Sequence, residues 1–210
     1  MPDSSHPIFA RLYARMSARM DRAGGAELRR TMLDGLTGRV IEVGAGNGRN
    51  FAQYPATVAE VIAVEPEPTM RALARAAAQT TPVPIRVVAG AVSALPGGDG
   101  EYDAAVTSLV LCSVPDQTAA LAEIHRVVRP GGWLCFLEHV QADAPGLRRV
   151  QRVADATLWP RMFGGCHTGR DTLAAISAAG FTVDWVKRFR FPEGPLAGPA
   201  AEHILGRATR

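Results

Sequence analysis

Long apolar runs are absent from this chain of 210 residues. No stretch reaches the roughly 18 consecutive apolar residues that a membrane-spanning helix needs. The first 20 residues contain several arginines and lack the uninterrupted apolar segment of a signal peptide. These absences exclude a spanning helix and predict a cytoplasmic location.

Cysteine is scarce, and its three residues, Cys112, Cys135 and Cys166, stand far apart. Their number is odd and no C-x-x-C pair occurs, which argues against a disulfide framework and against a structural zinc site. We therefore expect a reducing compartment. Asp and Asn do not cluster as hard oxygen ligands would, so we expect no bound metal and no metal-dependent catechol chemistry.

Lysine is nearly missing, because Lys187 is the only one and arginine supplies the rest of a net charge of +3. The arginines are spread along the chain and stand side by side only at 29–30 and 148–149. Nucleic-acid binding needs a clustered basic surface, so no nucleic-acid partner is expected. The length and the 47% apolar content are typical of one globular domain.

The most informative segment is VIEVGAGNGRN, residues 40–50. An apolar, β-branched run leads into Gly44, Gly46 and Gly48, which predicts a buried strand, a tight turn and the start of a helix. Glycine allows a close approach to a ligand, and backbone N–H groups at such a turn favour a carboxylate or phosphate. The dinucleotide fingerprint would need glycine where Arg49 stands. The pattern suits a cofactor with an amine and a carboxylate, such as S-adenosylmethionine.

Strand-like and helix-like segments alternate along the chain. Short apolar segments predict strands at 39–44, 58–64, 85–88, 103–111, 133–138, 181–189 and 202–209. One-sided spacing predicts helices at 8–20, 26–34, 48–53, 67–79, 116–128, 147–158 and 170–179. This alternation predicts an α/β fold with an open, doubly wound sheet, and the last two strands read as an antiparallel hairpin.

We expect a single domain over residues 1–210. It would comprise an N-terminal helical cap (1–35), a cofactor-binding core (36–140), and substrate-side helices with the closing hairpin (141–210). The amphipathic helix 8–20 could pack on the domain, cap a pocket, or contact a membrane surface without spanning it. The sequence does not indicate an oligomeric state.

Glu65 directly follows the predicted strand 58–64. In a doubly wound sheet, ligands bind beyond the carboxyl ends of the strands where the winding reverses, which is also where the glycine turn is predicted. The two oxygens of a carboxylate can accept hydrogen bonds from both hydroxyls of a vicinal diol. Glu65 is therefore predicted to bind a ribose.

Residues 38–140 resemble class I S-adenosylmethionine-dependent methyltransferases through the motifs VIEVGAGNGRN, VIAVEPEP, AGAVSALP, YDAAVTSLVLCSVPD and IHRVVRPGGWLCFLEHV. The resemblance implies a Rossmann-like sheet of seven strands in the order 3-2-1-4-5-7-6, with strand 7 antiparallel. It also implies S-adenosylmethionine as cofactor.

A closer resemblance extends into the C-terminal half. The segments NFAQYP, TSLVLCSV, WPRMFGGCHTGRDT and EHILGRAT are similar to the methyltransferase-like family of alkyl thiol S-methyltransferases, which implies a thiol acceptor. Members of that family carry a hydrophobic N-terminal anchor, whereas this chain has the amphipathic helix 8–20 in that place.

The resemblance implies cofactor contacts at the carboxyl ends of the first strands. They are Glu42 near the methionine ammonium; Gly44, Ala45, Gly46 and Gly48 along the methionine portion; Glu65, Pro66 and Met70 at the ribose and adenine; Ala91 and Val92 beside the adenine; and Ser108 and Leu109 near the sulfonium. Many members have an acid at the position of Ala91 that accepts the adenine amino group. In this chain the hydrogen bond from the adenine amino group would be accepted instead by the backbone, by Ser93 or by water.

Methyl transfer from a sulfonium is an in-line displacement, so the protein mainly aligns the two reactants and excludes water. The catalytic candidates are His139, which follows the strand 133–138, and His167 in the Gly-Gly-Cys-His turn. Each could serve as a base or orienting group, or be structural. Four aromatic residues could wall an apolar acceptor pocket: Phe9, Tyr13, Trp159 and Phe163.

We therefore expect a methyltransferase for a small, fairly apolar acceptor, with a thiol favoured. The alternative within the class is an O-, N- or C-methyltransferase of a natural product, quinone or lipid head group, because acceptor loops carry little sequence signal. From another class, a non-catalytic S-adenosylmethionine-binding regulatory subunit would keep the same glycine turn. The strand 103–111 lacks the Asn/Asp-Pro-Pro-aromatic signature, which disfavours exocyclic amines of nucleic acid or protein glutamine as acceptors.

Overall fold

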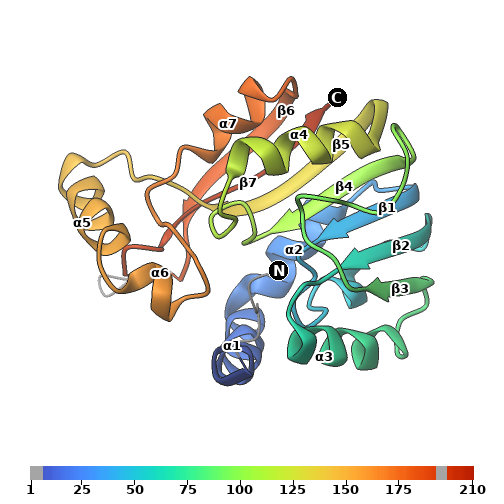
Figure 1. Cartoon of the computed structure of the whole chain (residues 1–210), viewed down its shortest axis with the longest axis horizontal. Helices are drawn as coiled ribbons and strands as arrows, with labels where there is room; N and C mark the ends of the chain where they lie inside the picture. The colour runs from blue at the N-terminus through green and yellow to red at the C-terminus, as the bar shows by residue number, and fades with distance from the viewer. Residues whose placement is uncertain (1–6, 193–197) are drawn as a thin grey trace.

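A mixed β-sheet forms the centre of the computed structural model, which describes residues 7–192 and 198–210, with side chains from residue 13 onward in the first helix. The described residues form seven strands: β1 (Gly38–Val43), β2 (Val58–Val64), β3 (Ile85–Val88), β4 (Tyr102–Ser108), β5 (Val128–His139), β6 (Thr182–Arg190) and β7 (Glu202–Thr209). Their order is β3-β2-β1-β4-β5-β7-β6 (Figure 1). Strands β1 to β5 are parallel, and β7 is antiparallel to β5 and β6. The predicted topology is confirmed.

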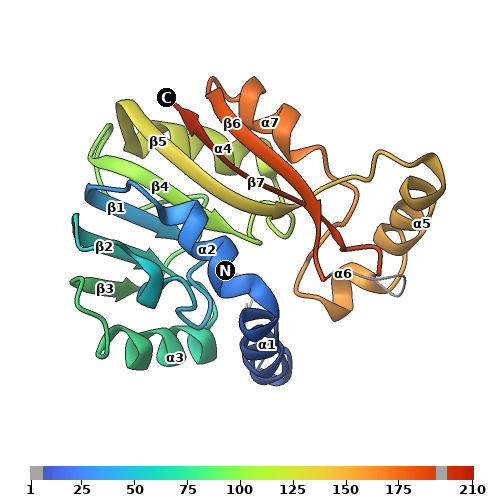
Figure 2. The same cartoon turned by 180° about the vertical axis from the view of Figure 1, so that it is seen from behind.

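Helices cover both faces of the sheet. They are α1 (Pro7–Met20), α2 (Ala26–Leu33), α3 (Pro68–Ala78), α4 (Gln117–Val127), α5 (Pro145–Asp155), α6 (Trp159–Met162) and α7 (Thr172–Ala178). Figures 1 and 2 show α4 and α7 on one face and α2 on the other. Alternate strand residues supply the two cores: Val40 lies in the core that includes Met32 of α2, and Ile41 in the core that includes Leu121 of α4.

Helices α1, α5 and α6 lie beyond the carboxyl ends of the parallel strands, toward which the arrowheads of β1, β2 and β4 point (Figure 1). Ligands of doubly wound sheets bind at this end. Within the described part of the chain, none of the helices combines the length and the apolar character needed to cross a bilayer.

Helix α1 is bound to the glycine turn that follows β1. The buried hydroxyl of Ser17 accepts hydrogen bonds from Asn47 Nδ2 and Arg49 Nε, both at 3.2 Å. Arg49 also donates to the Ala14 carbonyl at 3.2 Å and lies 3.5 Å from Asp21. The helix predicted at 8–20 therefore packs on the domain, and its Tyr13 also lines a pocket.

Two predicted elements differ from the structure. The helix expected at 48–53 is a series of turns ending in a short 3-10 helix, Phe51–Gln53. Asn50 directs its side chain inward to Glu42, and Pro55 leaves no room for a further helical turn.

The fourth strand, expected to run to residue 111, ends at Ser108. Leu109 has a φ of 59°, which is incompatible with a strand. Beyond it, the Glu138 carboxylate accepts the N–H groups of Val110 at 3.1 Å and Cys112 at 3.3 Å. This carboxylate replaces the lost sheet partners and holds the loop after β4 in place.

Other boundaries move by a few residues. Strand β5 starts at Val128, which pairs with Tyr102 ahead of the Pro-Gly-Gly turn. Helix α7 starts after Asp171, whose side chain caps it by accepting the N–H of Ala174. Arg170, expected to begin this helix, lies outside it.

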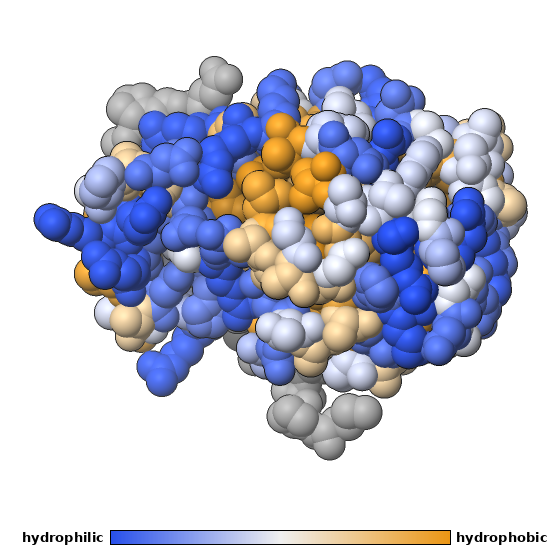
Figure 3. Space-filling model, turned by 90° about the horizontal axis from the view of Figure 1, so that it is seen from above, coloured by the Kyte–Doolittle hydropathy of each residue, from blue (hydrophilic) through white to orange (hydrophobic). Residues whose placement is uncertain are grey.

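Strand β6 forms one edge of the sheet. Val186 on this strand is 40% exposed. Separately, the face of the molecule seen in Figure 3 has a central apolar area framed by polar side chains. The exposed Lys187 and Arg188 put charge on the edge, which opposes pairing with a strand of another chain.

Candidate functional site

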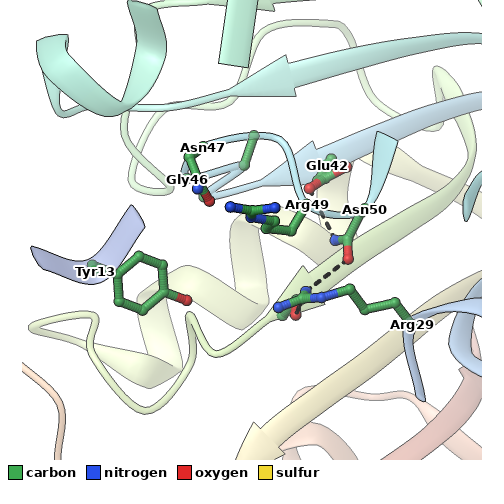
Figure 4. Close-up of a pocket in the computed structure, with 10 residues that line it drawn as sticks. Tyr13, Arg29, Glu42, Gly46, Asn47, Arg49 and Asn50 are labelled. Carbon is green, nitrogen blue, oxygen red and sulfur yellow. Dashed lines mark hydrogen bonds between the residues drawn. The ribbon is translucent and has the colours of Figure 1, made fainter. Parts of the chain in front are cut away.

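A pocket of about 260 Å³ lies at the carboxyl ends of β1 and β4, under α1 and α2. Its lining comes from both helices, from the glycine turn and from the end of β4: Tyr13, Arg29, Glu42, Gly44, Ala45, Gly46, Asn47, Arg49, Asn50 and Ser108. The ring of Tyr13 faces the glycine turn across this pocket (Figure 4). We call it the glycine-turn pocket.

Gly46 occupies the turn in a conformation that L-residues rarely adopt, with a φ of 57°. A Cβ built on it would have no atom within 4 Å, so this side of the turn faces open space. The turn therefore has room for a ligand to pass directly over its backbone. Its N–H donates to Glu65 Oε2 at 2.7 Å.

Glu65 directly follows β2 and is 6% exposed. Its Oε2 accepts from Gly46 N and its Oε1 accepts from Glu67 N at 2.8 Å, so the carboxylate is fixed at both oxygens. Burial raises the pKa of Glu65, against the effect of these two N–H donors. Each oxygen keeps further acceptor capacity, as binding of a vicinal diol requires.

Glu42 on β1 is buried, and its two oxygens accept from Asn50 Nδ2 at 2.9 Å and Tyr54 Oη at 2.6 Å. Burial raises the pKa of Glu42 to about 7, although both hydrogen bonds oppose the shift. The carboxylate therefore changes charge close to neutral pH, and a ligand cation beside it would favour the ionised form.

Arg29 is a site residue that the sequence analysis missed. From α2 its Nη1 donates to Asn50 Oδ1 and Ser108 Oγ, both at 2.8 Å, and its Nε lies 3.3 Å from Asp21 Oδ1. The side chain is buried and joins α2, the glycine turn and β4 (Figure 4). The guanidinium is suited to bind a carboxylate.

Four further residues line this pocket but are not among the predicted cofactor contacts: Tyr13, Asn47, Arg49 and Asn50. Three of them lie within the motif VIEVGAGNGRN: Asn47, Arg49 and Asn50. Their position in the sequence beside its glycines is a signal by which they could have been predicted as site residues. Burial raises the pKa of Tyr13, which keeps its hydroxyl protonated. The sequence predicts this aromatic side chain as a possible wall of the acceptor pocket instead.

The predicted cofactor residues divide into two groups. Glu42, Gly44, Ala45, Gly46 and Ser108 line the glycine-turn pocket, and Glu65 binds the turn from beneath. The others do not line it: Gly48, Pro66, Met70, Ala91, Val92 and Leu109. Of these, Gly48 packs tightly, since a Cβ on it would lie 2.8 Å from Phe51.

A second pocket of about 280 Å³ adjoins the first through Arg29, which lines both. It is largely apolar and is lined by Met20, Gly25, Leu28, Arg29, Leu109, Leu137, Phe191 and His203. Burial lowers the pKa of His203 to about 3, so this imidazole is neutral at physiological pH. We call this the apolar pocket.

The two predicted catalytic histidines lie near each other but line neither pocket. His139 Nδ1 is 3.4 Å from Cys166 Sγ, and its ring lies 4.6 Å from that of His203, a residue of the apolar pocket. His167 Nδ1 is 2.8 Å from the Gly165 carbonyl oxygen, and its backbone N–H donates to the Cys112 carbonyl.

The predicted aromatic wall is only partly formed. Tyr13 lines the glycine-turn pocket, while Trp159 and Phe163 stack on each other with ring centroids 4.2 Å apart. Neither of these two lines either pocket. The side chain of Phe9 lies outside those that the structure describes.

Comparisons with known proteins identify the family of this chain. Residues 41–136 match the family described as Methyltransferase domain. Human thiol S-methyltransferase TMT1A is 35% identical over 176 residues, covering 81% of this chain and 70% of that protein. Mouse thiol S-methyltransferase TMT1B is 36% identical over 188 residues, covering 85% and 74%. A Thermotoga maritima methyltransferase structure, described as a possible histamine N-methyltransferase, shares the fold with a TM-score of 0.69, 24% identity and 96% coverage of both chains.

The sheet order, the glycine turn and the acid after β2 define a class I methyltransferase that uses S-adenosylmethionine. By sequence, the chain belongs to the family of the thiol S-methyltransferases TMT1A and TMT1B. The site fits the methyl donor chemically: it offers room over Gly46, buried carboxylates for an ammonium and a diol, and a guanidinium for a carboxylate.

The raised pKa of Glu42 predicts pH-dependent donor binding. Only the ionised carboxylate attracts the donor ammonium, so affinity should rise with pH toward about 7 and fall about tenfold per unit well below it. Binding at pH 7 should release up to about half a proton per chain, measurable by calorimetry in buffers of different ionisation enthalpy. Glu42→Gln should bind more weakly and lose this proton release, while an unchanged release would exclude Glu42 as its source.

Proposed function

We propose that this chain transfers a methyl group from S-adenosylmethionine to the sulfur of a small, apolar thiol. The observation that carries the proposal is the apolar pocket next to the glycine-turn pocket, with Arg29 at their junction. The relatives named as thiol S-methyltransferases support sulfur as the acceptor atom, because the chain spans more than two thirds of each.

The glycine-turn pocket binds the methionine portion of the donor. Glu42 attracts the ammonium, Arg29 attracts the carboxylate, and the chain of atoms between them passes over Gly46. Glu65 accepts both ribose hydroxyls through the oxygens that Gly46 and Glu67 already hold in place. Pre-positioned acceptors lose little freedom on binding, which favours affinity.

The remaining predicted contacts complete the donor site. Ala91 and Val92 follow β3 and flank the adenine, with Pro66 and Met70 on its ribose side. Ser108 ends β4 and Leu109 follows it, and the two stand at the boundary of the two pockets, since Ser108 lines one and Leu109 the other. The sulfonium therefore lies at this boundary, with its methyl group directed to the apolar pocket.

The donor supplies a methyl group that is already activated by the sulfonium charge. The protein's remaining task is to align the acceptor and favour its thiolate, because even a thiol with the cysteine pKa near 8.5 is only about 3% ionised at pH 7 and a simple alkyl thiol is ionised less. His139 ends β5 beside His203 of the apolar pocket and is the group we assign to this task. His167 contacts the Gly165 carbonyl with its ring and the Cys112 carbonyl with its backbone N–H. We assign it to positioning the segment between α6 and α7 against the loop after β4.

An assay with S-adenosylmethionine and a panel of aliphatic thiols, phenols, amines and a quinol tests this proposal, with release of S-adenosylhomocysteine as the readout. We expect release with thiols only. Release with a phenol, amine or quinol alone would favour an O-, N- or C-methyltransferase. Donor binding without release from any acceptor would favour a regulatory subunit.

Filling the apolar pocket should affect only the acceptor. Leu28 is a half-buried residue of α2 that lines this pocket and not the other. Leu28→Trp is expected to raise the KM for a thiol at least about tenfold, because one large ring occupies the space of the ligand. Arg30→Trp, exposed on the opposite side of α2, is the matched control. Equal KM values in both variants would contradict this pocket as the acceptor site.

A further inference from the structure

Two cysteines and a histidine from separate segments meet at the acceptor side of the sheet. Cys112 lies in the loop after β4, His139 ends β5, and Cys166 lies between α6 and α7. One ligand atom from each, two sulfurs and one ring nitrogen, all lie within 4.8 Å of one another. Cys166 Sγ and His139 Nδ1 are 3.4 Å apart.

This donor set and its spacing match a zinc ion. Zn²⁺ is bound by Cys sulfur at about 2.3 Å and His nitrogen at about 2.0–2.1 Å, which in a tetrahedron puts sulfur and nitrogen about 3.6 Å apart. The observed 3.4 Å is close to that value. Two thiolates and one neutral imidazole would also balance the charge of the ion in this buried place.

Backbone contacts hold the three segments together. The N–H of Cys112 donates to Glu138, next to His139, and its carbonyl accepts from His167 N, next to Cys166. The Cys166 N–H donates to the Phe163 carbonyl at 3.1 Å. The ligands are therefore pre-positioned by the fold, as a metal site requires.

The cluster borders the apolar pocket. His139 stands two residues after Leu137 on β5, so both side chains lie on the same face of the sheet, and Leu137 lines the pocket. The His139 ring also contacts His203, a second lining residue. Cys112 is buried, but His139 is partly accessible, which leaves an approach from this side.

We propose that Cys112, His139 and Cys166 bind Zn²⁺ and leave its fourth position open to the acceptor thiol. The inference rests on the proposed function, because the thiol is the acceptor assigned there. Three protein ligands with one open position are the arrangement of catalytic zinc sites. His139 then promotes ionisation of the thiol as a metal ligand and not as a free base.

The step balances without a further reactant. The thiol binds the ion and releases its proton to solvent, since a thiol that coordinates zinc is deprotonated. A lone pair of the thiolate sulfur forms a bond to the methyl carbon, and the carbon–sulfonium bond breaks with its electron pair going to the donor sulfur. The products are a neutral thioether and S-adenosylhomocysteine, and the thioether leaves because it is a weak ligand.

Cobalt titration of the metal-free, full-length protein under anaerobic conditions tests the site. We expect one Co²⁺ per chain with a thiolate-to-cobalt charge-transfer band and tetrahedral d–d bands, and a shift of these bands when butanethiol is added. Cys112→Ala and Cys166→Ala should each weaken cobalt binding more than about 100-fold, beyond the loss from an outer-shell group. Cys135→Ala, a buried cysteine of β5 outside the cluster, is the matched control.

The zinc-loaded enzyme should methylate butanethiol faster than the metal-free enzyme at pH 7, and this advantage should shrink as the pH rises, because a larger fraction of the free thiol is then ionised without the metal. The proposal would be overturned if the cobalt bands were absent, if Cys112 and Cys166 formed a disulfide and bound no metal, or if butanethiol left the cobalt bands unchanged. Failure of the proposed function is distinct: only a non-thiol acceptor would be methylated, while the cobalt bands from the three protein ligands would remain.

Discussion

Glu65→Ala is expected to weaken S-adenosylmethionine binding by at least about 100-fold. A hydrogen bond to a charged group contributes about 1.5–3 kcal/mol, so losing two ribose contacts costs about 3–6 kcal/mol. The substitution also leaves the N–H groups of Gly46 and Glu67 without their acceptor, which loosens the glycine turn. Calorimetric titration with S-adenosylhomocysteine measures the loss without turnover.

Two variants separate ribose binding from general damage. Glu65→Gln keeps the shape but removes the charge, so it should fall between the wild type and alanine. Glu60→Ala removes another acid of β2, paired with Arg39 away from the pocket, and should bind normally. Wild-type affinity in Glu65→Ala would place the ribose elsewhere than at the end of β2.

The fold was predictable because its signals are local. The strand before the glycine turn shows an apolar run, and the following strand ends at an acid, so each element can be recognised within ten residues or so. The predicted end of a strand was wrong where a contact between residues far apart in the sequence determines that end. Glu138 ends β4 at Ser108 by taking the N–H groups of the next loop, and no periodicity in residues 103–111 encodes that contact.

The site was predictable in part for the same reason. Glu42 and Gly46 lie in one motif and Glu65 ends the next predicted strand, whereas Arg29 reaches the pocket from a separate helix. Its spacing carried a signal, because Arg29 stands three and four residues before Met32 and Leu33 and so shares their buried face. A buried arginine on an apolar face needs partners, which is a reason to assign it to a site.

The cysteine and histidine cluster had no comparable signal. Metal sites are recognised in sequence by short spacings between ligands, and here 27 residues separate His139 from Cys166. The three segments meet only because β4 and β5 are neighbours and the chain after α6 returns to the loop after β4. The absence of a C-x-x-C pair therefore does not exclude a site of this kind.

Gly46→Leu is expected to weaken donor binding by up to about 100-fold while the protein remains folded. The new side chain would extend into the open space over the turn, where we place the methionine portion of the donor. Filling a ligand's space costs about 1–3 kcal/mol, which corresponds to a loss of up to about 100-fold in affinity. The positive φ of 57° adds about 1–2 kcal/mol of backbone strain to the folded state.

Gly35→Leu is the matched control for this strain. Gly35 has a φ of 76°, its Cβ would also meet nothing within 4 Å, and it lies in an exposed turn outside both pockets. Both variants should lose similar stability in thermal denaturation, but only Gly46→Leu should lose affinity for S-adenosylhomocysteine. Parallel loss of affinity in both would show that backbone strain is responsible. Full affinity in Gly46→Leu would mean that the donor does not pass over the turn, so the glycines would then serve the tight turn alone.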